Sequence, residues 1–250
     1  MASEFGVNLA TSEVPVIDVT NTEERKYLLG LVPEDVIGNR AISSALVEML
    51  PTGSGIKVDT RNITWATTDM YANALTTARV KDARIIVAAP FPVSGTAALT
   101  GIFKGVEVAT GKSLGDRSKT VANEELVATG KLGQEIGRDK ATKLILLVKE
   151  RVAAERPNNS EQIRKTVINV AGDLNINLHN RQIDEITALM QKVNGLKLEV
   201  KDISGQLSGL RDEVERAISK RPEAKNLLQR VLDAINRLIE QIRSLILGGK

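Results

Sequence analysis

The sequence predicts an α+β protein: a small ferredoxin-like βαββαβ domain followed by an all-helical C-terminal region. Runs of β-branched and aliphatic residues with strand spacing occur only before Gly111, where they alternate with helix signals. Beyond Gly111, apolar residues recur at helical spacing instead. The chain has 250 residues, of which 42% are hydrophobic and 26% charged, a composition that suits one large or two smaller folded domains.

The first predicted strand covers residues 14–19, a short β-branched run with the sequence VPVIDV. A helix is expected to follow through residue 31, because Asn21 with Glu24 three residues later matches a capping box. The chain therefore begins with a strand and then a helix.

A hairpin is predicted next, since the apolar stretch 41–50 and the strand 56–63 flank a Pro, Gly and Ser turn cluster. Thr67 or Thr68 is expected to cap a helix over 69–78. A buried strand at 85–89 follows, closed by the prolines at positions 90 and 92, and Ser94 is expected to cap a helix over 95–108. These elements complete the βαββαβ order and add a helix.

Helices fill the remainder, with Asn159 and Gln162 suiting a cap and Gly172 and Gly195 suiting helix ends. The predicted spans are 118–135, 138–155, 160–171, 181–194, 201–219 and 222–247. The predicted divisions are a disordered N-terminus at 1–13, an α/β domain at 14–111, a helical extension packed on it at 112–156, and a C-terminal helical domain at 157–250.

Composition narrows the classes of function. The chain has no cysteine, which excludes disulfides, zinc–thiolate sites and thiol nucleophiles. Aromatic residues make up only 2%, and the net charge of +3 comes without a long basic run, so no nucleic-acid partner is expected. No apolar stretch reaches the roughly 18 residues of a membrane span, and residues 1–10 lack the pattern of a signal peptide.

The last predicted helix, over 222–247, is amphipathic and basic, and two interpretations remain open for it. It packs on its own helical domain, as such helices usually do, or it docks on an anionic membrane surface or in the groove of a partner. The candidate docking residues share 3–4 spacing or a basic side chain. They are Leu228, Val231, Ile235, Leu238, Ile242, Leu245, Arg230 and Arg237.

The most distinctive local feature is Ser94, Gly95 and Thr96, which follow a predicted strand and open a helix. The free N–H groups at such a helix start could hold an anion, whereas the simpler interpretation is an N-cap with tight packing of small residues. The single histidine, His179, is expected to be a capping or surface residue. No catalytic residue, metal-ligand set or cofactor is predicted.

Four blocks in this order resemble the YpuA-like family of bacterial proteins, catalogued as a domain of unknown function, number one thousand and two. They are VTNTEERKYL at 19–28, IGNRAISS at 37–44, MYANAL at 70–75 and APFPVSGTAALTG at 89–101. The resemblance is specific over roughly residues 14–150. Two departures are Arg79, where the family tends to have glycine, and Gly105 with Val106, where it usually has Ala-Tyr.

The resemblance implies an exported protein, secreted or in the cell envelope, whose signal peptide has been removed from this chain. It brings no catalytic residues. We therefore expect a noncatalytic module that binds an envelope component or a protein partner. The alternative is a cell-envelope hydrolase with its site near Ser94 to Thr96, which requires a base that the sequence does not display. The sequence assigns no oligomeric state.

Overall fold

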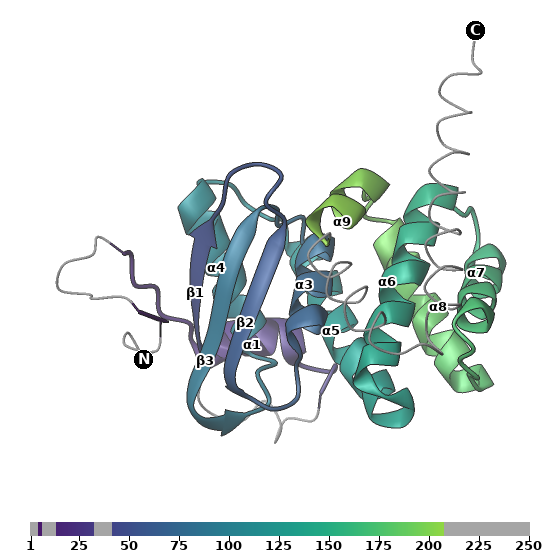
Figure 1. Cartoon of the computed structure of the whole chain (residues 1–250), viewed down its shortest axis with the longest axis horizontal. Helices are drawn as coiled ribbons and strands as arrows, with labels where there is room; N and C mark the ends of the chain where they lie inside the picture. The colour runs from purple at the N-terminus through teal and green to yellow at the C-terminus, as the bar shows by residue number, and fades with distance from the viewer. Residues whose placement is uncertain (1–4, 7–13, 33–41, 208–250) are drawn as a thin grey trace, which may run out of the picture.

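The computed structural model describes residues 5–6, 14–32 and 42–207, and it is a mixed α+β fold. A three-stranded sheet lies at one end and helices fill the other (Figure 1). The elements are α1 (Asn21–Leu28), β1 (Ser44–Met49), β2 (Ile56–Ile63), α3 (Thr68–Thr77), β3 (Ala83–Val93), α4 (Ala98–Thr110), α5 (Asp116–Ile136), α6 (Arg138–Glu155), α7 (Ser160–Asp173), α8 (Asn180–Asn194) and α9 (Val200–Gln206).

The sheet has the order β1-β3-β2, with β1 antiparallel and β2 parallel to the central strand. The predicted hairpin is therefore wrong, because β1 and β2 flank β3 and do not pair with each other. The turn cluster between them spans the start of β3, where the Asp82 carboxylate accepts from the amides of Gly53 and Gly55, both at 3.0 Å. These contacts hold the turn cluster beside the start of β3.

A ferredoxin-like βαββαβ domain is not confirmed. Residues 14–19, the expected first strand, lie outside the sheet and pair with no described strand. Asp18 is held through its backbone carbonyl, which accepts from Lys104 Nζ at 2.7 Å. The β-branched pattern indicated a strand here, but strand pairing depends on a partner that the pattern does not specify.

Strand β3 runs through Pro90 and Pro92, where the sequence predicted its end. Its pairing with β1 stops at Ala88, and its pairing with β2 is interrupted between Arg61 and Ile63. The prolines fall in this irregular stretch, so their missing N–H groups remove no regular ladder bond. The strand can therefore continue to Val93.

Local caps largely follow the prediction. Thr67 caps α3 and Asn159 caps α7, each accepting from a backbone amide three residues on. The first helix is capped one residue earlier than expected, by Thr20 with Glu23 in a capping box. His179 is the N-cap of α8, again in a capping box, which confirms its predicted structural role.

Helix α4 packs on β1 and α3 packs on β2, and the helices from α5 to α8 follow beyond α3 (Figure 1). One core cluster of buried side chains extends from Ile56 to Leu207 and includes residues of both the sheet and the helices. The predicted domain boundaries stay predictions. Within the described ranges, no helix is long and apolar enough to cross a membrane.

Candidate ligand-binding site

A cavity of about 440 Å³ lies between strand β1, helix α4 and the extended segment 14–19. Its volume is within the range of small-ligand pockets, roughly 300–1,000 Å³. We call it the β1–α4 cavity. Its lining is mainly small and aliphatic, and consists of Phe5, Val14, Pro15, Val16, Ile17, Asp18, Val19, Glu24, Ser43, Ser44, Ala45, Leu46, Val47, Ala97, Ala98, Gly101, Gly105, Val108 and Ala109.

Helix α4 leaves room for this cavity because small residues recur along one face. Ala97, Gly101, Gly105 and Ala109 are spaced four apart, so they stack on one side of the helix. A Cβ at Gly105 would lie 2.9 Å from Val47 Cγ2, whereas one at Gly101 would make ordinary contact with Val19 at 3.5 Å. The helix therefore approaches β1 closely at Gly105 and leaves space at Gly101.

Glu24 of α1 brings a buried carboxyl group to the cavity wall, with a side chain only 1% exposed. Its partner in the described structure is the Asn21 amide, at 3.5 Å from Oε2. Burial raises the pKa of Glu24 above its ordinary value, and the Asn21 contact opposes this only partly. A weakly compensated carboxyl beside a cavity is a typical feature of a binding site.

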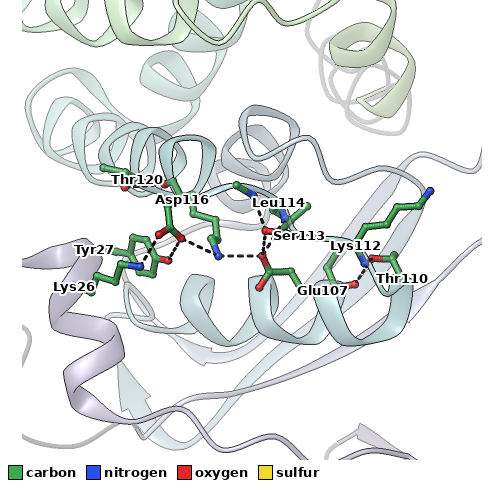
Figure 2. A network of polar contacts seen from close by, with 12 residues as sticks. Lys26, Tyr27, Glu107, Thr110, Lys112, Ser113, Leu114, Asp116 and Thr120 are labelled. Atoms are coloured by element: carbon green, nitrogen blue, oxygen red, sulfur yellow. Dashed lines mark hydrogen bonds and ion pairs between the residues drawn. The ribbon is translucent and has the colours of Figure 1, made fainter.

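Helix α1 is held in place by ion pairs that reach both neighbouring helices (Figure 2). Asp116 at the start of α5 accepts from Lys26 Nζ at 2.9 Å and from the Tyr27 hydroxyl at 3.2 Å. Lys119 lies 3.3 Å from Asp116 and 3.0 Å from Glu107 of α4. These contacts, led by the Lys26 hydrogen bond, lower the pKa of Asp116 to about 2.

A second set of contacts fixes the segment that forms the outer cavity wall. Lys104 of α4 donates to the Asp18 carbonyl and also to Glu23 Oε1 at 2.8 Å. Glu23 in turn accepts from the Thr20 amide at 2.8 Å, within the capping box. Segment 14–19 and α1 are thus joined to α4, which keeps Glu24 at the wall of the cavity.

The Ser94 to Thr96 segment is not at this cavity. The predicted Ser94 cap is wrong, because α4 starts at Ala98 with Ala97 as an N-cap without a side-chain bond. Gly95 has a φ of +85°, its carbonyl accepts from the Tyr71 hydroxyl, and a Cβ there would lie 2.5 Å from both that hydroxyl and Ile63. Glycine is therefore required by backbone and space.

Ser94 Oγ and Thr96 Oγ1 lie 3.3 Å apart and bond each other. Within the residues that the structure covers, no titratable side chain hydrogen-bonds either hydroxyl. Gly95 packs tightly against Tyr71 and Ile63, which agrees with the packing part of the simpler interpretation, whereas its N-cap part is wrong. Anion binding by Ser94, Gly95 and Thr96 stays a prediction.

A second cluster of buried polar groups joins α3, α5 and α6. Lys149 Nζ, fully buried, lies 2.8 Å from Glu125 Oε1, 2.7 Å from the Asn73 carbonyl and 3.0 Å from the hydroxyls of both Thr76 and Thr77, so its three N–H groups are shared among four acceptors. Thr77 also donates to the other Glu125 oxygen. Both charged groups are buried inside the cluster, which therefore joins the three helices and offers no surface to a ligand.

Sequence reasoning missed Glu24 as a site residue, having assigned it to the helix cap. The signal that could have found the site is the four-residue spacing of small residues on α4. Both departures from the family pattern fall at positions where the backbone or the available space is constrained. Arg79 has a φ of +65°, a conformation that favours glycine, and Gly105 allows α4 to approach Val47.

The candidate docking residues between Leu228 and Leu245 lie outside the described residues. Among described residues, no group of three or more His, Cys, Asp or Glu is arranged to hold a metal ion.

Comparison with known proteins gives two matches. A family model described as "Protein of unknown function (DUF1002)" matches residues 1–210. The "Uncharacterized protein YpuA" of Bacillus subtilis (strain 168) is 42% identical over 218 residues, which cover 87% of this chain and 75% of that protein. No solved structure gives a significant match.

Proposed function

Because this chain belongs to the DUF1002 family, which includes the YpuA-like protein that it resembles, we propose that it is an exported, cell-envelope-associated binding protein that acts without catalysis. The proposed ligand site is the β1–α4 cavity. The single observation that carries this function is a pocket-sized cavity with a small, apolar lining and one weakly compensated carboxyl group. Such a surface binds a ligand by burial and orients it through one charge.

The location in this proposal rests on the resemblance to exported bacterial proteins. It is tested with an antibody against the purified chain, applied to fractions of the source bacterium. We expect the protein in the culture medium, the wall or the membrane fraction. Recovery only with cytoplasmic marker proteins would refute export.

The cavity is tested with the neutral apolar dye N-phenyl-1-naphthylamine, whose fluorescence rises in apolar sites. Gly101→Leu is expected to abolish the rise, because the longer side chain extends into the cavity from a position where its Cβ fits. Gly172→Leu is the matched control, since Gly172 is exposed on α7 and its new Cβ would meet no atom within 4 Å. Equal dye binding by both variants would refute the cavity as the binding site.

The basic amphipathic pattern of residues 222–247 supports an additional envelope contact. Co-sedimentation of the full chain with anionic vesicles or purified cell wall, compared with a variant carrying Arg230→Glu and Arg237→Glu, tests it. We expect the variant to lose most of the vesicle binding. Unchanged binding would leave the cavity as the sole proposed site.

A further inference from the structure

The two edges of the sheet differ in how they are protected. On β2, the exposed residues Lys57, Asp59 and Arg61 are charged, and Asn62 has a φ of +57° at the register shift. Charges and irregular pairing are the usual means by which proteins block an edge strand. The β2 edge is thus closed to further strands.

Among the described residues, the β1 edge carries fewer of these protective features. Its sequence, SALVEM, has Glu48 as its only charged residue, and the four residues Ser44, Ala45, Leu46 and Val47 line the cavity. Within the described ranges, these four residues make backbone bonds only in the ladder with β3. Within those ranges no other backbone group pairs with their outward amide and carbonyl groups, which can therefore accept an added strand.

The cavity has room and charge for one kind of strand. Four residues of β1 extend about 13 Å at roughly 3.3 Å per residue, which fits a short peptide strand. Across from them, Gly101 of α4 leaves space for an aliphatic side chain. The titratable side chains among the described lining residues are Asp18 and Glu24, both acidic, so the lining complements a cation.

We infer that the β1–α4 cavity binds an extended peptide segment of a partner protein, which adds to the β1 edge and places an arginine or lysine side chain against Glu24. The inference deepens the proposed function, on which it rests, by naming the class of ligand. Backbone pairing with β1 supplies affinity, the pocket beside Gly101 takes an apolar side chain, and Glu24 selects the basic one. The free edge and the buried carboxyl lie on the same cavity, and this juxtaposition carries the inference.

The test measures fluorescence anisotropy of labelled peptides with the full chain. The first peptide is acetyl-Thr-Val-Arg-Val-Thr-Val-amide, the second has glutamate in place of arginine, and the third repeats the first with alternate backbone amides methylated. We expect the arginine peptide to bind, and the other two to bind at least about tenfold more weakly. Methylation removes the donors that pair with β1, and glutamate meets a like charge.

Variants locate the contact. Glu24→Gln is expected to weaken binding of the arginine peptide at least about tenfold. Asp59→Asn, on the protected edge, is the matched carboxylate control and should change nothing. Hydrogen exchange should show protection of the outward-facing β1 amides only in the complex, because the other β1 amides already pair with β3. If Gly101→Leu fails to fold, Ala109→Phe at the exposed end of the lining replaces it as the blocking variant.

Three results would overturn the inference. Equal binding of the arginine and glutamate peptides would exclude charge selection, and protection at β2 would place the peptide elsewhere. Outward-facing amides of β1 that are already protected in the free protein would show that another segment of this chain occupies the edge. If Gly101→Leu loses dye binding and the chain binds no peptide, the proposed function stands and only its peptide ligand is rejected. If Gly101→Leu loses neither dye binding nor peptide binding, both the cavity as binding site and its peptide ligand are rejected.

Discussion

Two glutamates on different helices, Glu24 and Glu125, are each 1% exposed and yet have opposite surroundings. Glu125 faces Lys149 at 2.8 Å and accepts from Thr77, inside a cluster closed on all sides. Glu24 meets one amide at 3.5 Å and lies on a cavity. Burial of a carboxylate therefore identifies no role by itself. The role follows from whether the protein supplies the countercharge or leaves that to a ligand.

The largest expected effect comes from breaking the compensated cluster. Lys149→Met leaves the Glu125 carboxyl buried without its cation and should lower the free energy of unfolding by about 3–5 kcal/mol. Urea denaturation followed by circular dichroism measures it. Lys140→Met, exposed on the same helix, is the control and should change stability little. A loss below about 1 kcal/mol for Lys149→Met would contradict the structural role.

Removing both charges sharpens the same contrast. The double variant Lys149→Met with Glu125→Leu should recover more than half of the stability that Lys149→Met loses, because no unpaired charge remains buried. Thr76 keeps its bond to the Asn73 carbonyl, while Thr77 loses its acceptor, so recovery is incomplete. The same denaturation experiment gives the coupling energy. A double variant no more stable than the single one would show that packing, not charge, dominates this site.

The uncompensated glutamate should behave in the opposite way. Glu24→Gln is expected to stabilise the free protein at pH 7 by on the order of 1 kcal/mol, because it removes a buried charge that has no cation partner. Since the pKa of Glu24 is raised in the folded state, stability is full below its ordinary value of 4.5 and is lost as the pH rises through the folded pKa.

The gain from Glu24→Gln should therefore grow between pH 4 and pH 7, as measured by thermal unfolding at both values. Charged residues of the described structure close to Glu24 in the chain or at its cavity include Glu23 and Arg25 on α1 and Asp18 on the preceding segment, and Arg25 donates to Asn21 Oδ1 at 2.9 Å. Lys104 of α4 bonds Glu23 and the Asp18 carbonyl. A gain independent of pH would show that folding does not raise the pKa of Glu24.

The smallest effect is expected at the partly exposed carboxyl of the preceding residue, Glu23. The hydrogen bond from Lys104 and the capping bond from the Thr20 amide lower the pKa of Glu23 to about 2. Its stabilising contribution is present above 4.5 and is lost as the pH falls toward 2. Glu23→Gln should flatten this acid limb by only a few tenths of a kcal/mol, because the pair is solvent-screened. If the wild type and Glu23→Gln lose the same free energy of unfolding between pH 6 and pH 3, this expectation is refuted.

Features set by near neighbours were the ones that the sequence predicted best. The caps at Thr67, Asn159 and His179 depend on a side chain and an amide three residues away, and all three occur. The span of α6 is as predicted, since its apolar spacing and flanking glycine are local. Family membership followed from short blocks of residues, which can be recognised without knowledge of the fold.

Only the tertiary structure decided which strands pair and which charges meet. The order β1-β3-β2 joins strands across intervening helices, and Lys149 reaches Thr76 from 73 positions away. The cavity beside Glu24 likewise requires β1, α4 and residues 14–19 to converge. Local patterns predict the secondary structure of a segment, because its caps and periodicity involve residues only a few positions apart. Which segments lie side by side is a property of the whole packed chain, where competing pairings differ by small free energies.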